Sequence, residues 1–317
     1  MTVIETGGLT RIYGDRTVVD SVDLDVAAGR VHALLGPNGS GKTTTVRMLA
    51  TLVRPSAGYA RIAGHDTVRD AREVKRRIGL VGQFHAIDPR LTGAENLTMF
   101  GRMNGLPARR ARDHARELLE RFDLTAAADR PAREYSGGMR RRLDIVAAMV
   151  VRPAVLFLDE PTTALDPRSR NQIYGCIREF VAAGTAVLLT TQYLEEAARL
   201  ADTVTILDAG RVVAAGTPHD LTAEIGGGLD IVADARRGDD ITTVITGFGG
   251  VPTGGGDSDV PDAATLSYSF PQADIPLLPI LRALDTAGID VHDIGRRRAT
   301  LDDAFLALTG PTQRITR

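Results

Sequence analysis

Short apolar runs and amphipathic segments alternate over about the first 220 residues of the chain. Apolar runs that are bounded by turn residues predict buried strands. Segments with apolar residues three and four positions apart, such as residues 117–122, predict helices with one buried face. The alternation of the two is typical of an α/β domain. The buried strands are expected at residues 31–35, 154–158, 186–190 and 204–207.

Two regions depart from this alternation. Near the start of the chain, strand-like segments predict an antiparallel β subdomain. These strands are expected at residues 2–6, 18–26 and 60–62. Residues 208–216 contain an Asp-Ala-Gly-Arg turn and predict a hairpin. About residues 88–150 are mostly helical in pattern and polar on one face, which predicts a helical insertion into the α/β core.

Three glycines at residues 226–228 interrupt the pattern. We therefore expect a first domain at residues 1–222 and a small C-terminal α+β domain at residues 223–317. Residues 247–259 are rich in Gly, Pro, Asp and Ser and predict a mobile loop. The second domain is expected to hold strands at residues 229–233, 266–270 and 291–295 and helices at residues 277–287 and 301–308.

Composition narrows the classes of protein. The formal net charge of −2 and a pI near 6.3 give no basic field that would attract nucleic acid. Aromatic residues are only 4% and Trp is absent, which disfavours a platform for stacking bases. No apolar run reaches the ~18 residues of a membrane helix, no signal peptide is evident, and Cys176 is the only cysteine. We expect a cytoplasmic protein whose membrane association would come through a partner.

The strongest chemical signal is a glycine-rich loop between a predicted strand and a predicted helix. Its glycines let backbone N–H groups approach an anion, and the helix adds the positive end of its dipole. Lys42 would reach the β and γ phosphates, and the Thr43 hydroxyl would hold Mg²⁺. The residues expected to bind the phosphates are Gly36, Pro37, Asn38, Gly39, Ser40, Gly41, Lys42, Thr43 and Thr44.

Two acids follow the apolar strand at residues 154–158. The carboxyl ends of parallel strands face the ligand crevice, so Asp159 would hold Mg²⁺ and Glu160 would activate or orient the attacking water. A second anion-binding signal is Ser136-Gly137-Gly138 before another predicted helix. One nucleotide does not need two such sites in one chain. We therefore expect the second site to cap a nucleotide that is held by another copy.

With these motifs in this order, the first ~220 residues resemble the ATP-binding subunit of an ABC transporter. The resemblance implies a P-loop NTPase fold and a role for several further residues. Tyr13 would stack on adenine, and the alternative is an ordinary exposed Tyr in a turn. Gln83 would reach Mg²⁺ and the water and couple to the membrane partner. Asp166, in the Ala-Leu-Asp sequence 164–166, would contact the opposite subunit.

The sequence departs from the family pattern at one catalytic position. Gln192 stands where the family usually has a histidine that touches the γ-phosphate. A glutamine amide donates a hydrogen bond but cannot carry the charge of an imidazolium. We therefore expect Gln192 to position phosphate without acid–base work.

Residues 135–144, Gln192 and residues 300–310 are similar to the daunorubicin-resistance type of exporter ATPase. This resemblance implies a homodimer that sandwiches two MgATP molecules. It also implies a separate integral membrane permease that exports an antibiotic, lipid or other amphipathic compound. The chain would then lie peripherally on the cytoplasmic face of the membrane.

A soluble ABC-type ATPase that acts on the ribosome or DNA is the alternative. Translation factors of that type usually carry two such domains, and DNA-acting relatives insert a long coiled coil or cysteine-rich zinc modules. This chain has one set of motifs, no sustained heptads and one cysteine. A further alternative is that the C-terminal domain alone binds drug or regulates dimerisation.

Overall fold

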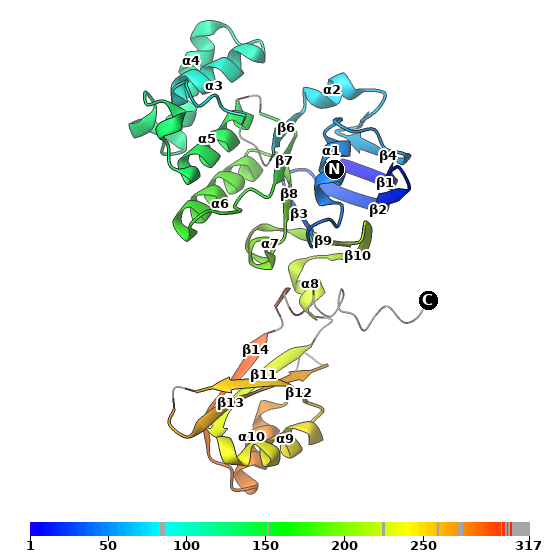
Figure 1. The fold of residues 1–317 in the computed structure, drawn as a ribbon, viewed down its shortest axis with the longest axis vertical. Coiled ribbons are helices and arrows are strands. Elements are labelled where there is room, and N and C mark those ends of the chain that lie inside the picture. Colours follow the sequence, from blue (N-terminus) through cyan, green and yellow to red (C-terminus); the bar gives the residue numbers. More distant parts are fainter. Residues whose placement is uncertain are drawn as a thin grey trace. The chain divides into compact units, whose positions relative to one another are not determined.

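The computed structural model describes residues 1–82, 86–150, 152–223, 226–258, 260–271 and 275–298, together with residues 300, 301, 303 and 305. The chain divides into two compact units, Met1–Ala215 and Gly216–Arg317 (Figure 1). Each unit has a hydrophobic core of its own. The two units divide after Ala215, whereas the sequence predicts a boundary after residue 222. The two positions differ by about the length of one short helix, α8 (Pro218–Ala223).

A six-stranded sheet with the order β10-β9-β3-β8-β7-β6 forms the centre of the first unit. The pairs β3–β8, β3–β9, β6–β7 and β7–β8 are parallel. Every residue of β3, β7 and β8 is buried, which explains why these strands are continuous apolar runs in the sequence. The strands are β3 (Val31–Leu35), β6 (Ile78–Val81), β7 (Val155–Asp159), β8 (Ala186–Thr191), β9 (Thr203–Asp208) and β10 (Arg211–Gly216). The predicted buried strands and hairpin are confirmed.

A smaller sheet with the order β2-β1-β4-β5 confirms the predicted antiparallel subdomain. Its strands are β1 (Thr2–Tyr13), β2 (Arg16–Ala27), β4 (Ala57–Ile62) and β5 (His65–Asp66). Buried Ile4, Val22 and Ile62 of this sheet share one core cluster with Leu34 and Phe157 of the parallel sheet. The subdomain is therefore packed onto the centre of the unit.

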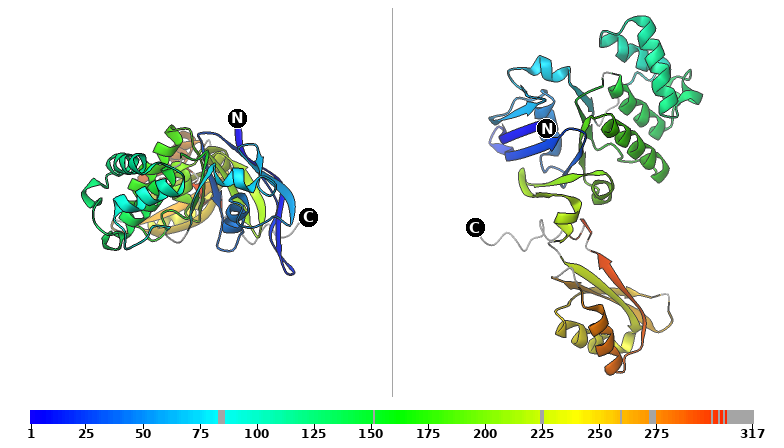
Figure 2. Two further views of the ribbon diagram at one scale, coloured as in Figure 1. Left: turned by 90° about the horizontal axis from the view of Figure 1, so that it is seen from above. Right: turned by 180° about the vertical axis from the view of Figure 1, so that it is seen from behind.

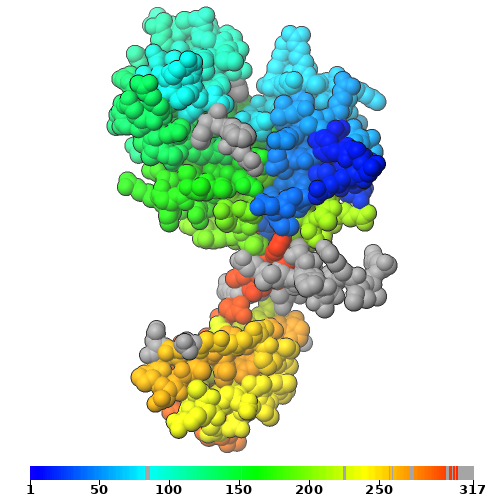
Figure 3. Space-filling model, viewed as in Figure 1, coloured from blue at the N-terminus to red at the C-terminus, as the bar shows by residue number. Residues whose placement is uncertain are grey.

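The helical insertion is also confirmed. It comprises α3 (Gly93–Met103), α4 (Ala108–Arg121), η1 (Thr125–Ala127), η2 (Ala132–Glu134) and α5 (Gly137–Met149). A capping box starts α3, because Thr92 Oγ1 accepts from the Glu95 backbone N–H while the Glu95 carboxylate accepts from Thr92 N–H. The insertion and the antiparallel sheet lie on opposite sides of the first unit, in turquoise to green and in blue (Figure 3). The other helices of this unit are α1 (Lys42–Leu49), α2 (Ala71–Lys75), α6 (Pro167–Ala182) and α7 (Leu194–Leu200).

The second unit holds an antiparallel sheet with the order β12-β13-β11-β14. Two helices pack on one face of this sheet (Figure 2). Its core includes Leu229, Tyr268, Ile245 and Ile280. The elements after α8 are β11 (Gly227–Asp234), η3 (Ala235–Arg237), α9 (Gly238–Gly247), β12 (Val251–Asp257), β13 (Ala263–Phe270), α10 (Leu277–Thr286) and β14 (Val291–Arg298). The α+β prediction is confirmed.

The predicted mobile loop at residues 247–259 is wrong. Residues 251–257 form the edge strand β12, which pairs with β13. Ladder hydrogen bonds need only the backbone, so a Gly-Gly-Gly stretch can supply an edge strand that its composition disfavours. At Gly255 a Cβ would lie 2.7 Å from the Thr265 carbonyl oxygen, so the approach of the two strands requires a glycine there. The predicted helix at residues 301–308 lies largely outside the described residues.

Candidate active site

The phosphate loop connects the buried strand β3 to helix α1. Gly41 is the N-cap of α1 and has φ 103°, a left-handed conformation that favours glycine. At Gly36 a Cβ would lie 2.3 Å from the Leu207 carbonyl oxygen. The loop therefore turns tightly between β3 and α1 with room for backbone only. Pro37, Asn38 and Gly39 are exposed at its tip, and Thr44 is half-buried in α1.

Lys42 lies almost fully buried under this loop, at 4% exposure. Its Nζ donates to the carbonyl oxygens of Gly36 at 2.8 Å and Pro37 at 3.0 Å. Burial lowers the pKa of Lys42, while the charges of Glu160 and Asp159 act in the opposite direction. The ammonium group is thus held inside the turn, where a bound anion would meet it.

Asp159 ends β7 and links this strand to the neighbouring strand β8 and to helix α1. Its Oδ1 accepts from Thr190 Oγ1 at 2.6 Å and from Thr43 Oγ1 at 3.2 Å. Thr190 belongs to β8, and Thr43 lies in the first turn of α1. The carboxyl ends of β3, β7 and β8 therefore bring a carboxylate and two hydroxyls together beside the phosphate loop. These are hard oxygen donors, the kind that Mg²⁺ prefers.

Glu160 follows directly and has φ 49°, an uncommon backbone conformation for a residue with a side chain. Its N–H donates to both the carbonyl oxygen and Oγ1 of Thr190, at 3.1 Å each. Its carboxylate accepts from Thr163 Oγ1 at 3.3 Å and is only partly buried. The backbone is thus fixed while one face of the carboxylate stays accessible.

The second predicted anion site is the N-terminus of α5. Ser136 is the N-cap, and its Oγ accepts from the Met139 N–H at 3.2 Å. Ser136 and Gly137 are exposed, whereas Gly138 is buried. A Cβ on Gly138 would lie 2.2 Å from Ser169 Oγ, so the start of α5 approaches the start of α6 closely. Figure 1 shows α1 and α5 on opposite sides of the parallel sheet.

Asp166 has a structural function in this chain. It is the N-cap of α6, where its carboxylate accepts from the Ser169 N–H at 3.0 Å and from Ser169 Oγ at 2.5 Å. The hydrogen bonds from Ser169 lower the pKa of Asp166. The residue expected to contact another subunit therefore also sets the surroundings of Gly138, through Ser169.

The remaining predicted residues lie around these groups. Tyr13 ends β1, is 43% exposed, and has the guanidinium of Arg11 over its ring, 4.3 Å from the centroid. Gln192 follows β8 and is half-buried. Gln83 lies outside the described residues. Sequence reasoning missed Thr190 and the buried Arg141; the only signal for Thr190 was its place at the carboxyl end of a predicted strand.

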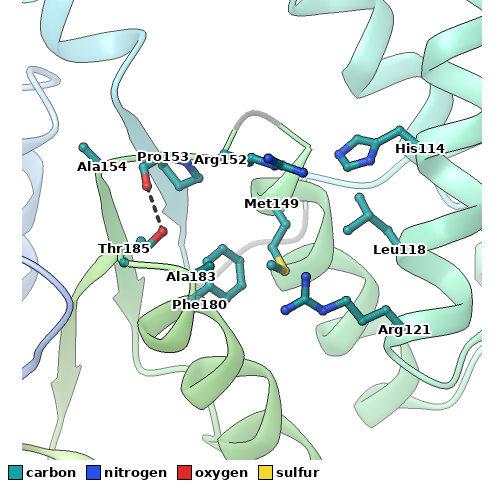
Figure 4. Close-up of a pocket in the computed structure, with 11 residues that line it drawn as sticks. His114, Leu118, Arg121, Met149, Arg152, Pro153, Ala154, Phe180, Ala183 and Thr185 are labelled. Carbon is teal, nitrogen blue, oxygen red and sulfur yellow. Dashed lines mark hydrogen bonds between the residues drawn. The ribbon is translucent and has the colours of Figure 1, made fainter.

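A cavity lies elsewhere, between the helical insertion and α6 (Figure 4). Its volume is about 480 Å³. Leu118, Met149 and Phe180 form an apolar part, while His114 and Arg152 point toward each other at the rim. It adjoins Ala154 and Thr185 at the amino ends of β7 and β8, opposite to the ends that carry the acids. It is therefore separate from the phosphate loop.

Among the helices of the described residues, none is both long and apolar enough to cross a membrane.

The chain is similar to known proteins in its sequence and in its fold. The model of the ABC transporter family matches residues 19–163. The chain is 49% identical to the daunorubicin resistance ATP-binding protein DrrA3 of Streptomyces coeruleorubidus, over 99% of this chain and 98% of that protein. It is 47% identical to the daunorubicin/doxorubicin resistance ATP-binding protein DrrA of Streptomyces peucetius, over 97% and 92%. A solved ATP-binding subunit of an ABC transporter matches with a TM-score of 0.63 and 30% identity, over 69% of this chain and 92% of that one.

Proposed function

Because this chain belongs to the family of ABC transporter ATP-binding subunits, and is an ABC-type ATPase, we propose that two copies of it sandwich two MgATP molecules to power export. The observation that carries the proposal is the unequal construction of its two anion sites. The loop before α1 encloses a phosphate with a buried lysine, whereas the N-terminus of α5 is open to solvent on the other side of the sheet. Each nucleotide would lie between the loop of one copy and α5 of the other.

Within one copy, the phosphate loop and Lys42 would bind the β and γ phosphates. The buried Ser40 Oγ has no hydrogen-bond partner among the described residues, which leaves it available to the ligand. Tyr13 would stack on adenine, with Arg11 already covering one face of its ring. Gln192 would donate an amide hydrogen bond to the γ-phosphate, and Gln83 would orient the water.

The residues present fit Mg²⁺. Thr43 and Asp159 offer a hydroxyl and a carboxylate 3.2 Å apart, and Mg²⁺ is commonly held by one or two such protein oxygens together with substrate phosphates. When bound, the ion neutralises charge on the phosphates. Thr190 would keep Asp159 in place, because its hydroxyl already donates to that carboxylate.

Glu160 would take the proton from the attacking water as general base. Its carboxylate is only partly buried and its backbone is pinned by Thr190, so a water could be oriented without moving the chain. The γ-phosphate would contact both copies, and ADP would lack these contacts. This difference in affinity would close the dimer with ATP and open it after hydrolysis.

The export function follows from the relatives. Their names record resistance to daunorubicin and doxorubicin, and they align with this chain over nearly their full length. We infer that the chain works with a separate membrane permease, at the cytoplasmic face of the membrane, and that the cargo is an amphipathic antibiotic or lipid. Nothing in the comparisons favours a soluble ATPase that acts on ribosomes or DNA.

Dimerisation tests the proposal. Purified Glu160→Gln protein should be monomeric without nucleotide and with MgADP, and dimeric with MgATP, by sedimentation or light scattering. Adding Lys42→Ala to that variant should abolish the change, because the phosphate loop would no longer hold the nucleotide. Glu160→Gln protein that stays monomeric at saturating MgATP would contradict the sandwich.

Export needs a separate assay. Cells that carry the chain and its permease should accumulate less daunorubicin than cells with the Glu160→Gln variant and the same permease. Equal accumulation of daunorubicin and of other amphipathic antibiotics would contradict drug export while leaving the ATPase intact.

A further inference from the structure

Arg141, on α5, is a buried cation that the mechanism above does not use. It is 6% exposed, and its guanidinium donates four hydrogen bonds, all to backbone carbonyl oxygens. The acceptors are Pro161 at 3.0 Å, Gly82 at 2.6 Å, Asp159 at 3.1 Å and Glu160 at 3.4 Å. Three of these four carbonyls belong to the segment that carries the two acids of the site.

The geometry of an arginine suits this task. A guanidinium presents five donors in a rigid plane, so several carbonyls that bind it are fixed relative to one another. Glu160 has a left-handed backbone conformation, which surrounding contacts must hold in place. Thr190 holds the N–H of Glu160 from β8, and Arg141 holds its carbonyl from α5. The position of the carboxylate thus depends on α5.

Asp144 extends the same arrangement. It lies one turn after Arg141, and the two side chains form an ion pair of 3.6 Å. Its Oδ1 also accepts from the Ala86 N–H at 3.0 Å. Gly82 and Ala86, the described residues on either side of residues 83–85, are therefore both bound to α5.

The same helix begins at the exposed anion site. Arg141 lies five residues after Ser136, about 7.5 Å along the axis at 1.5 Å per residue. A helix transmits a small displacement over this distance as a rigid rod. Gly138 packs against Ser169, so the first turn of α5 is also tied to the start of α6.

We propose that Arg141 is a positioning residue that links the phosphate contact at the start of α5 to the placement of Glu160 in the same chain. The inference rests on the proposed dimer. In that dimer the start of α5 contacts the nucleotide of one site, and Glu160 serves the other. Binding of ATP at one site would therefore change the position of the Glu160 carboxylate at the second site. The two sites would then hydrolyse ATP cooperatively.

A purely architectural role is the competing explanation. A buried arginine with its counter-ion is often no more stabilising than apolar residues of similar volume. Arg141→Met keeps the apolar volume and removes the donors, and Arg141→Lys restores one charged nitrogen. The neighbouring Arg142 is the matched control, because it is 7% exposed on the same helix and, among the described residues, donates no hydrogen bond to residues 159–161.

The experiment measures ATPase rate against ATP concentration for the parent, Arg141→Met, Arg141→Lys and Arg142→Met proteins, with thermal unfolding of each. We expect Arg141→Met to lower kcat roughly 10- to 10²-fold, the cost of a small misplacement, while KM changes by less than about threefold. The parent should have a Hill coefficient above 1 that falls to about 1 in Arg141→Met. Arg141→Lys should recover part of kcat, and Arg142→Met should keep both the parent's kcat and its Hill coefficient.

The outcomes separate this inference from the proposed function. If Glu160→Gln protein dimerises with MgATP but Arg141→Met retains the parent's kcat and Hill coefficient, the inference is overturned and the sandwich stands. A loss of kcat in Arg142→Met equal to that in Arg141→Met would also overturn it, since helix stability alone would then explain both. Failure of Glu160→Gln to dimerise would overturn the sandwich and this inference together.

Discussion

The N-termini of α1 and α5 offer the same chemistry to a phosphate but are built differently. Before α1, the chain turns tightly at Gly36 and Gly41 and buries Lys42 beneath the turn. Before α5, Ser136 and Gly137 are exposed, and within the described part of the chain no buried lysine other than Lys42 is found. The first surrounds an anion with backbone and charge, whereas the second presents a single open face.

The difference indicates how a site can be divided between molecules. An enclosed loop can bind a nucleotide by itself, since its donors surround the anion and the lysine supplies charge. An open helix end such as that of α5 offers its dipole, a few N–H groups and the Ser136 hydroxyl from one side only, which are worth little against water. It contributes when another surface brings the phosphate to it. The predictions below test whether the two regions bind separately and act together.

Removing the general base should have the largest effect. Glu160→Gln should slow ATP turnover roughly 10²- to 10⁴-fold, because the amide cannot accept the proton from water. ATP affinity should change little, since the phosphate loop is untouched. Steady-state ATPase rates and equilibrium binding of a fluorescent ATP analogue measure the two quantities. Turnover within a few-fold of the parent would remove Glu160 from the catalytic role.

Mixing two inactive variants should show that each site is shared. Lys42→Ala disables the enclosed loop, and Gly137→Asp places a negative charge at the open helix end. The Gly137 position has space for a Cβ, and an acid near a helix N-terminus does not destabilise the helix. A mixed dimer would hold one site with both halves intact. If the sites were independent, an equal mixture would recover about a quarter of the parent rate.

The uncharged Gly137→Asn variant is the control for the mixture. It has nearly the shape of aspartate but does not repel phosphate, so it should retain most of the parent's activity alone. Monomeric ATP binding should be lost in Lys42→Ala and preserved in Gly137→Asp. A mixture that stays as inactive as its components would indicate that both motifs act on the same chain's nucleotide.

Local signals made much of the fold predictable from the sequence. The strands β3, β7 and β8 are buried on both faces, so their residues form apolar runs that need no tertiary information to be recognised. The phosphate loop and the pair Asp159-Glu160 likewise lie directly after such strands. The exposed edge strand β12 was missed because its pairing with β13 uses backbone groups of glycines, which carry no pattern.

Long-range polar contacts could not be predicted from the sequence either, because they too use backbone groups. Arg141 finds its acceptors on Gly82, 59 residues away, and on Pro161, 20 residues away. Both acceptors are main-chain carbonyls, which every residue has, so no residue type in the sequence marks them. The sequence has three consecutive arginines at 140–142, and nothing in it distinguishes a buried arginine from one on a solvated helix face. The roles of Gln83 and Gln192 stay predictions.

Acid should lower the free energy of unfolding through His32, which lies in β3, the strand before the phosphate loop. His32, in β3, is buried between Thr203 and Thr205, and burial lowers its pKa from 6.5 to about 4. The unfolded chain therefore binds a proton at a pH where the folded chain does not. The resulting stability is complete above pH 6.5 and is lost as the pH falls toward 4, by roughly 3 kcal/mol.

The measurement compares the parent with His32→Gln by urea unfolding from pH 7.5 to pH 4.5. Other groups titrate equally in both proteins, so the difference between the two curves isolates His32. The free energy of unfolding should fall more steeply in the parent. Parallel curves would show that His32 carries no such penalty.

The smallest effect is expected at a buried carboxylate that contacts the segment after Glu160. Glu196, on α7, is 1% exposed, and its carboxylate accepts from Thr162 Oγ1 at 2.8 Å, two residues after Glu160. Burial raises the pKa of Glu196 above 4.5, against the hydrogen bonds that favour its charged form. The folded chain thus holds this proton more tightly than the unfolded chain. The contribution of Glu196 to stability is greatest below pH 4.5, and it falls as the pH rises through the raised pKa.

Glu196→Gln keeps an oxygen for Thr162 and removes the buried charge. The variant should therefore unfold at a slightly higher urea concentration than the parent at pH 8, and at the same concentration at pH 4.5. Its kcat should stay near that of the parent, since Arg141 and Thr190 still hold Glu160 from either side. A large fall in kcat with unchanged stability would instead show that α7 helps to couple the N-termini of α1 and α5. The comparison between the enclosed site and the open site would then have to include α7.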